Sequence, residues 1–259
     1  MKKVQFVMSG VMMVLAITMT SCVSCWKEQT LLSVDITTEQ RQLTGFEEIE
    51  INGSPTIYYT QTDSFSVKVK GPEEYVKNIL TEVDGKTLVI RNKGKLGMFN
   101  IQLGDDDELA VYVTSPDLIG IRLNGSGDFI SKQRIDTDKM DILLRGSGDI
   151  NVKDIICDRC EVELIGSGDI DLDHIDTKGL SASLVGSGDI GLHLWNTADT
   201  RLALKGSGDI DATFQENCDA VKCELRGSGD ITLKGKVKRF SKEQSGSGDV
   251  SVGQLSVQP

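Results

Sequence analysis

Leu144-Arg145-Gly146-Ser147-Gly148-Asp149-Ile150 contains the phrase that decides the fold. Gly-Ser-Gly-Asp followed by an aliphatic or aromatic residue occurs seven times in the chain. It begins at Gly125, Gly146, Gly166, Gly186, Gly206, Gly227 and Gly246. The successive beginnings lie 21, 20, 20, 20, 21 and 19 residues apart. A phrase that returns at a nearly constant spacing marks an internal repeat, so we expect one structural coil for each phrase.

Apolar residues recur at alternate positions on both sides of the phrase. Two residues before its first glycine stand Leu123, Leu144, Leu164, Leu184, Leu204, Leu225 and Gln244. Directly after its aspartate stand Phe129, Ile150, Ile170, Ile190, Ile210, Ile231 and Val250. A period of two indicates strands with one inward face, so each coil has two strands and like residues stack from coil to coil. Residues 116–259 are therefore predicted to form an all-β parallel β-helix (solenoid) of about 20 residues per coil. Its last coil is expected to be partly exposed, because Lys242 and Gln244 stand in inward columns.

The glycines and the aspartate of the phrase fit a sharp corner between the two strands of a coil. Glycine allows positive φ and a close backbone approach, and aspartate hydrogen-bonds backbone N–H groups in turns. The seven aspartates are predicted to form a structural corner ladder: Asp128, Asp149, Asp169, Asp189, Asp209, Asp230 and Asp249. Stacked carboxylates about 5 Å apart repel one another unless they are hydrogen-bonded or bridged. We expect no metal or cofactor, and calcium bound along the ladder is the alternative.

Residues 1–21 have the pattern of a lipoprotein signal peptide. Two lysines and the apolar stretch 4–19 precede Met19-Thr20-Ser21-Cys22. This sequence resembles a bacterial lipobox, which implies cleavage before Cys22 and lipid attached to it. Acyl chains on Cys22 would tether the protein to a membrane without a spanning helix. Residues 22–44 are polar and without a period, so we predict a flexible tether there.

Residues 45–115 show strand-like alternation interrupted by turns. Gly71-Pro72-Glu73-Glu74 predicts a short helix over 73–82, because proline suits the first helical position and acids suit the first turn. The segment is expected to form either irregular first coils of the β-helix or a cap over its open end. The acidic run 105–108 lacks the spaced ligands of a calcium loop, so we interpret it as a solvated loop.

The repeats and the stretch before them resemble a known family. The relevant residues are the recurrent Gly-Ser-Gly-Asp-Ile/Val after a leucine, together with Phe46-Glu47-Glu48-Ile49 through Ser115-Pro116-Asp117-Leu118. They resemble the putative auto-transporter adhesin, head GIN domain family of bacterial envelope proteins, over about residues 45–255. The resemblance implies a right-handed parallel β-helix that is oligomeric in some members, so a homo-oligomer is an expectation. It supplies no catalytic residues.

Four cysteines fall within the repeats, as Cys157-x-x-Cys160 and Cys218-x4-Cys223. Cys157 and Cys218 have the same phase but lie three coils apart, about 14 Å, which is too far for shared zinc ligation. A redox Cys-x-x-Cys normally begins a helix in a βαβ setting, and no such setting is predicted here. Export favours disulfides within each pair, and buried free thiols are the alternative.

Three residues form the most plausible catalytic set. Asp171 and Asp211 flank Gly191 from neighbouring coils and would stand about 10 Å apart, near the upper limit for an inverting glycosidase pair. His193 lies on an adjacent outward position. Coils that differ by one residue provide no long loop to wall a cleft, so solvated strand-face acids are the preferred interpretation.

The formal charge of −11 argues against nucleic-acid binding, which needs clustered Lys and Arg. The sequence therefore predicts a lipid-anchored, non-enzymatic protein of the cell envelope, at the outer membrane. We expect adhesion, scaffolding or ligand binding through the β-helix surface, with glycans or envelope proteins as partners. The alternatives are a polysaccharide-cleaving enzyme that uses Asp171, Asp211 and His193, and a calcium-stabilised structural solenoid.

Overall fold

A computed structural model describes residues 35–93 and 109–258, which belong to one compact unit. The predicted signal peptide, Cys22, the tether before residue 35 and the acidic run 105–108 lie outside the described residues. Within the described ranges the chain forms nineteen strands and one short helix, α1, over Glu73–Val76. The strands are β1 Ile36–Arg41, β2 Glu48–Gly53, β3 Thr56–Gln61, β4 Ser66–Pro72, β5 Ile79–Asp84, β6 Thr87–Asn92, β7 Ala110–Ser115, β8 Gly120–Gly125, β9 Asp128–Asp136, β10 Lys139–Gly146, β11 Asp149–Gly166, β12 Asp169–Gly186, β13 Asp189–Trp195, β14 Asp199–Gly206, β15 Asp209–Phe214, β16 Ala220–Gly227, β17 Ile231–Val237, β18 Arg239–Gly246 and β19 Val250–Val257.

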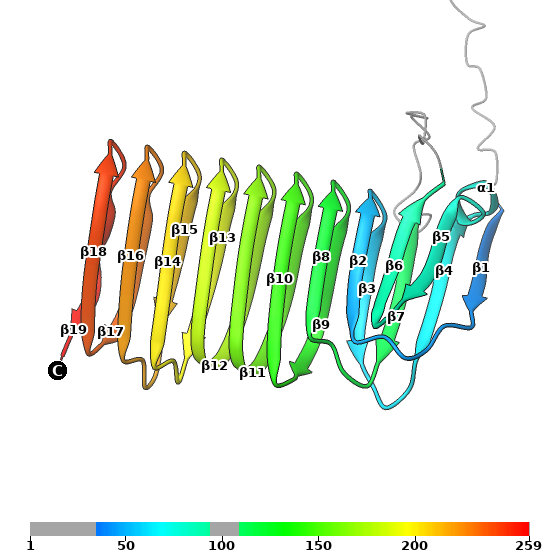
Figure 1. The fold of residues 1–259 in the computed structure, drawn as a ribbon, viewed down its shortest axis with the longest axis horizontal. Coiled ribbons are helices and arrows are strands. Elements are labelled where there is room, and N and C mark those ends of the chain that lie inside the picture. Colours follow the sequence, from blue (N-terminus) through cyan, green and yellow to red (C-terminus); the bar gives the residue numbers. More distant parts are fainter. Residues whose placement is uncertain (1–34, 94–108, 259) are drawn as a thin grey trace, which may run out of the picture. The chain divides into compact units, whose positions relative to one another are not determined.

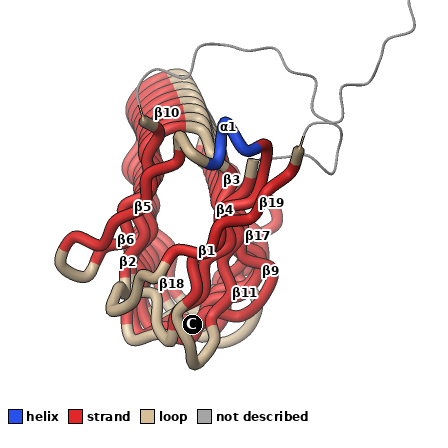
Figure 2. The backbone as a smooth tube through the Cα atoms, turned by 90° about the vertical axis from the view of Figure 1, so that its right-hand side faces the viewer, coloured by secondary structure: helices blue, strands red, loops and turns tan. Residues whose placement is uncertain are grey.

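The strands build two parallel sheets that meet at the Gly-Ser-Gly-Asp corners (Figure 1). The pre-corner sheet runs β6, β2, β8, β10, the end of β11, the end of β12, β14, β16 and β18. The post-corner sheet runs β7, β3, β9, the start of β11, the start of β12, β13, β15, β17 and β19. Seen along the long axis of this unit, the two sheets face each other (Figure 2). The predicted β-solenoid is confirmed, with about seven turns about 20 residues apart.

Like residues stack in register on both sides of the corners, and the post-corner sheet shifts register farther along, as between Leu172 and Ile175. Leu144 pairs with Leu164, Leu164 with Leu184, and Gly146 with Gly166. The leucine column that precedes the corners is buried in six successive coils: Leu123, Leu144, Leu164, Leu184, Leu204 and Leu225. Each added coil extends this continuous apolar core. Burying its leucine contributes about 2 kcal/mol to stability.

The segment before the repeats does not stack in chain order. Strand β2 lies between β6 and β8, and β3 lies between β7 and β9. The turn Asn52-Gly53-Ser54-Pro55 is therefore a further corner, in which Gly53 pairs with Gly125 and its carbonyl accepts the Ser126 N–H at 3.1 Å. Beyond the β6–β7 coil, strands β5, β4 and β1 pair antiparallel and end the parallel stacking.

The helix predicted over 73–82 is too long. Strand β5 begins at Ile79 and pairs antiparallel with β6, as in Ile79 with Asn92 and Val83 with Leu88. Pairing with a neighbouring strand outweighs the weak helical pattern of a segment this short, because isolated short helices are marginal in water. Only the turn that begins after Pro72 remains helical.

The tether predicted over 22–44 ends earlier than expected. Ile36–Arg41 forms β1, which pairs with β4 from Ile36–Pro72 to Arg41–Val67. After Ile36 all of its side chains are polar, and Arg41 Nη2 lies 2.8 Å from Glu39 Oε2. A polar strand of this kind suits the exposed edge of a sheet, where charges discourage further pairing.

The C-terminal coil has polar side chains in the inward columns, and they are exposed as the sequence predicts. Lys242 pairs with Cys223 and Gln244 with Leu225, so both continue apolar columns. Lys242 Nζ donates to Gln244 Oε1 at 3.3 Å and to the Val250 carbonyl at 3.4 Å. Gln244 Nε2 donates to the Gly248 carbonyl at 2.6 Å. The last coil thus satisfies its own polar groups at the open end of the core.

Candidate functional site

The corner aspartates bond to the backbone of the following coil. Oδ1 of Asp149 accepts the N–H of Asp169 at 3.2 Å, and Oδ1 of Asp169 accepts the N–H of Asp189 at 3.0 Å. The same bond recurs at 2.8–3.0 Å in the next three steps, which end at Asp249. These N–H donors offset part of the repulsion between stacked carboxylates. In the described part of the chain, no group of three or more His, Cys, Asp or Glu side chains is arranged to hold a metal ion.

The four repeat cysteines are free and buried in this structure, whereas the sequence favoured a disulfide within each pair and kept buried thiols as the alternative. Cys157 pairs with Thr177 at the bend opposite the corner, and its Sγ lies 3.6 Å from Thr177 Oγ1. Cys223 stands in an apolar column beside Leu202. A hydrogen bond from the Cys160 thiol lowers the pKa of Cys157, and that contact together with burial raises the pKa of Cys160. Cys157 has the place that Thr177 has in the next coil, and Cys160 and Cys223 have the places of leucines in neighbouring coils.

The structure brings two of the three candidate catalytic residues into one outward column. Asp171 pairs with Gly191, and Gly191 pairs with Asp211. Asp171 Oδ1 leans over the glycine, 2.5 Å from where a Cβ on Gly191 would lie. Burial and the neighbouring carboxylates, Asp169 first, raise the pKa of Asp171. His193 lies in the adjacent column, exposed, with Nδ1 3.2 Å from the Asp173 carbonyl oxygen. None of these three residues lines the open hollow on the pre-corner sheet.

This column continues along the post-corner sheet into two stacked aromatic rings. We call it the axial row, and it consists of Tyr112, Tyr58, Ile130, Asn151, Asp171, Gly191 and Asp211. The Tyr58 and Tyr112 rings are nearly parallel, with centroids 5.3 Å apart and planes at 16°. Tyr112 is 40% exposed, which is unusual for so large a ring, and exposed Lys68 is its neighbour on β4.

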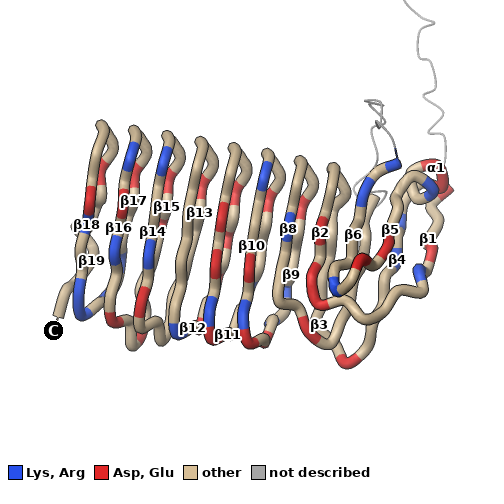
Figure 3. The backbone as a smooth tube through the Cα atoms, viewed as in Figure 1, with Lys and Arg blue, Asp and Glu red and all other residues tan. Residues whose placement is uncertain are grey.

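The aromatic end of this row was not predicted from the sequence. Aligning Asn52-Gly53-Ser54-Pro55 with the seven phrases would have placed Tyr58 in the column of Ile130, Asn151 and Asp171. Tyr112 could not be placed that way, because its strand reaches the row through a coil stacked out of chain order. In Figure 3 acidic residues recur at successive coils of this unit, whereas basic residues are scattered.

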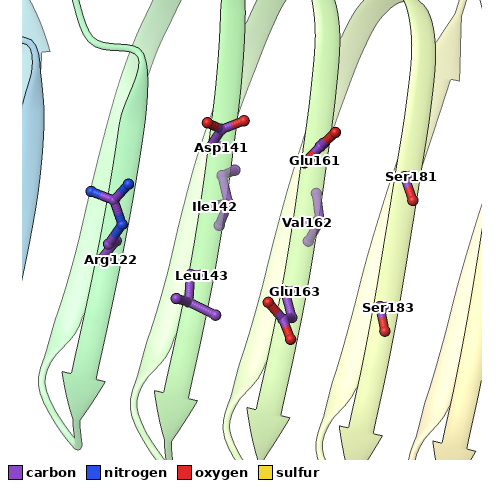
Figure 4. A pocket seen from close by; sticks show the side chains of 9 residues that line it. All are labelled: Arg122, Asp141, Ile142, Leu143, Glu161, Val162, Glu163, Ser181 and Ser183. Carbon is purple, nitrogen blue, oxygen red and sulfur yellow. The ribbon is translucent and has the colours of Figure 1, made fainter.

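The pre-corner sheet carries a shallow open hollow of about 330 Å³ (Figure 4). The hollow is lined by the short side chains of Ser181 and Ser183 and by the longer acidic side chains of Asp141, Glu161 and Glu163. Ile142 and Val162 point behind the strands toward the core (Figure 4). Arg122, also at its rim, forms an ion pair with Glu48 that holds the pKa of that carboxyl below its usual value. The hollow is open and is lined by polar and apolar side chains in similar measure, which differs from an enclosed, mostly apolar small-molecule site.

A cluster of ion-paired and aromatic side chains lies on the post-corner sheet, near the bend opposite the Gly-Ser-Gly-Asp corners. Arg134 Nε lies 2.8 Å from Asp154 Oδ2, and Asp154 Oδ1 lies 2.6 Å from His174 Nδ1. The His174 ring packs on Trp195 with centroids 4.3 Å apart. Both oxygens of Asp154 are used within the cluster, so it stabilises four successive rungs.

No helix among the described residues is long and apolar enough to span a membrane. The comparison with curated proteins finds no match. Among solved structures, a putative adhesin from Bacteroides fragilis NCTC 9343 has a TM-score of 0.74 and 24% identity, over 85% of this chain and 97% of that one. A putative adhesin from Parabacteroides distasonis ATCC 8503 has a TM-score of 0.66 and 18% identity, over 85% and 97%.

A protein named as a putative lipid binding protein, also from Parabacteroides distasonis ATCC 8503, has a TM-score of 0.58 and 23% identity, over 86% of this chain and 96% of that one. At these identities the likeness establishes the fold. The family model described as putative auto-transporter adhesin, head GIN domain, matches residues 45–220 and 184–259. Because these matches cover far more than half of the sequence, the chain belongs to that family.

Proposed function

We propose that this protein is a lipid-anchored, non-enzymatic adhesin of the outer membrane that binds extended partners through the outer surface of its β-solenoid. The observation that carries the proposal is the axial row, a straight outward column of stacked aromatic and polar side chains on a flat sheet. Extended concave or flat surfaces are what solenoid proteins use to bind partners. Membership in an adhesin-like family supports the same role at the cell envelope or surface.

A binding screen tests this function. Residues 35–259 are the appropriate soluble fragment, because β1 belongs to the compact unit and a start at residue 45 would remove it. We expect this fragment to bind at least one class of glycan or envelope protein in a salt-tolerant manner. If no glycan and no isolated envelope protein binds, the adhesin function is wrong.

The lipid anchor requires a separate test. Cells that express the full chain would be labelled with a clickable fatty acid, beside a Cys22→Ala variant. We expect label on the wild type alone, and recovery of the labelled protein with outer membranes. Label that persists in the Cys22→Ala variant would place the anchor elsewhere.

Glycan cleavage is a second candidate, supported by one specific feature. Burial raises the pKa of Asp171, and this carboxyl is separated from that of Asp211 by Gly191, so the row holds two carboxyls of the kind that acid–base catalysis uses. Release of reducing ends from a polysaccharide panel tests it. Activity that Asp171→Asn abolishes without unfolding would support an enzyme, and inert wild-type protein removes this candidate.

We propose that the corner ladder needs no cation, because backbone N–H groups bond its carboxylates from coil to coil. Thermal unfolding with calcium and with a chelator tests this proposal. Equal midpoints are expected, and a midpoint that falls in chelator would instead support the calcium-stabilised solenoid.

A further inference from the structure

We infer that the axial row binds an uncharged, extended glycan that lies along the solenoid axis, with Tyr58 and Tyr112 as its stacking platform. The inference rests on the adhesin function proposed above and specifies its ligand class. The row crosses six interstrand steps from Tyr112 to Asp211, which at about 4.8 Å each span about 29 Å. A linear ligand therefore fits it better than a compact one.

The aromatic end supplies the apolar contact that sugars use. The Tyr58 and Tyr112 rings stack on each other, so a sugar that lies over the row packs its C–H groups against their exposed outer edges and against the ring carbons left uncovered. The two rings stack at 16°, so they are held in fixed orientations before any ligand arrives. Ile130 pairs with Tyr58 and extends the apolar surface by one rung. Prior ordering of these side chains reduces the entropy cost of binding.

The middle of the row supplies hydrogen bonds for hydroxyl groups. Asn151 and Asp171 are exposed on adjacent rungs and can donate to and accept from sugar hydroxyls. Gly191 has no side chain, and the Asp171 carboxylate leans over it toward Asp211. A glycan that follows the row would contact the apolar tyrosine end first and then the hydrogen-bond acceptors of Asp171 and Asp211 on either side of Gly191.

Charge excludes anionic glycans from the row. The corner ladder runs two residues before it on the same strands, through Asp149, Asp169, Asp189 and Asp209. Burial, followed by the carboxylates of Asp169, Asp173, Asp149 and Asp189, raises the pKa of Asp171 by disfavouring its ionised form. A uronic acid or sulfated sugar beside them would be repelled in the same way.

A peptide strand is a poorer fit to this surface. Peptides commonly bind a sheet by pairing with a free strand edge. The strands beneath the middle of the row, β3, β9, β11, β12 and β13, are each paired on both sides, so their backbone groups are already used. A glycan needs no strand edge and uses side chains alone.

The test uses the full-length protein immobilised on a sensor surface. The probes are neutral linear oligosaccharides of four to eight sugars, namely β-glucans, mannans and chitin oligomers, with oligogalacturonate and sulfated oligomers beside them. We expect neutral chains to bind, affinity to rise with length until the chain covers the row, and the anionic chains to bind at least about tenfold more weakly. Asp171→Asn is expected to narrow that difference.

Four variants assign the binding to the row. Tyr58→Thr and Tyr112→Thr remove a ring and keep a strand-forming residue, and each is expected to weaken neutral-glycan binding by about tenfold or more. Tyr112→Phe keeps the ring and is expected to bind within about twofold of wild type. Val185→Thr, at a 38% exposed apolar position on the pre-corner sheet, is the matched control and is expected to leave binding unchanged.

Hydroxyl-radical footprinting on wild-type protein keeps the test independent of variant folding. Bound neutral oligosaccharide is expected to protect Tyr58 and Tyr112 and to leave Val185 reactive. Equal binding by the Tyr→Thr variants, tighter binding of anionic chains, or capture of a basic peptide in place of any glycan overturns this inference and leaves adhesion standing. Loss of every partner, envelope proteins included, overturns the proposed function as well.

Discussion

Each Gly-Ser-Gly-Asp corner uses two glycines, and for different reasons. The first glycine of the phrase has a positive φ, as in Gly186 at 146°, which side chains with a Cβ rarely adopt. The second does not, but a Cβ on Gly188 would lie 1.9 Å from the Gly168 carbonyl oxygen one coil away. The backbones of adjacent corners therefore touch directly, and the phrase is fixed by packing between coils.

This contact predicts a large effect for a small substitution. Gly188→Ala must push two corners apart, so we expect the free energy of unfolding to fall by at least about 2 kcal/mol. Gly253→Ala is the control, because nothing lies within 4 Å of its added Cβ, and it should change stability by less than about 0.5 kcal/mol. Urea denaturation of both variants measures the difference. Similar losses for the two would show that the corners can separate freely.

Buried acidic groups make the fold sensitive to alkaline pH. Burial raises the pKa of the Cys223 thiol from its usual 9.0 to about 12, and burial likewise raises the pKa of Tyr59 to about 12. For each group the neutral form is favoured in the folded state. The stabilisation is complete below the unfolded pKa and is lost as the pH rises through the folded pKa.

We therefore expect the unfolding free energy to fall between about pH 9 and pH 12, and to fall less steeply in Cys223→Val. Valine fits the column, which has Val162 three coils away. Tyr59 contributes equally to both proteins, so the difference isolates the thiol. Urea denaturation at several alkaline pH values measures it, and parallel curves would contradict the assignment.

At the scale of single elements, the two ends of the solenoid are protected differently. At the N-terminal end antiparallel strands and α1 follow the last parallel coil. At the C-terminal end β18 and β19 continue the parallel sheets, and the protection consists of Lys242 and Gln244 in inward columns. Inward-pointing charge at a sheet edge opposes pairing with another copy, because that pairing would bury the charge.

Replacing both residues by leucine should remove this barrier. The Lys242→Leu, Gln244→Leu protein continues the apolar columns to the open end, so we expect it to associate end to end at micromolar concentrations. Sedimentation velocity over a concentration series measures association. The Glu243→Leu variant, at an outward position of the same strand, is the control. Equal association of this variant and the double variant would indicate nonspecific hydrophobic association and not pairing through the open end.

The sequence predicted the repeating coils because their signals are local and repeated, and it failed where pairing depends on distant strands. The segment after Pro72 reads as a helix, yet β5 becomes a strand through its pairing with β6. Strand β1 lacks an alternating apolar pattern because it is an edge strand, which pairs with β4 on one side. Asp171 and Asp211 could be placed in one column because they lie in regular repeats. Tyr112 could not, because its strand is stacked out of chain order.

At the scale of the whole molecule, the period determines which changes the fold tolerates. Each coil contacts the coils on either side, so stability is close to a sum of coil and interface contributions. The corners are interchangeable, because Gly146, Gly166, Gly186 and Gly206 stack in one register. Removal of one complete period should therefore leave every remaining column continuous.

Deletion of residues 166–185 joins Ile165 to Gly186 and removes one period. We expect a folded protein that unfolds cooperatively, with a modestly lower denaturant midpoint and a smaller m-value because less surface is buried. Deletion of residues 166–175 removes half a period and joins Ile165 to Asp176, which loses one corner with its post-corner strand and brings the pre-corner end of β12 into the post-corner sheet. This second protein should fail to fold. Circular dichroism and urea unfolding distinguish the two, and equal damage from both deletions would mean that individual coils carry roles that their shared register does not explain.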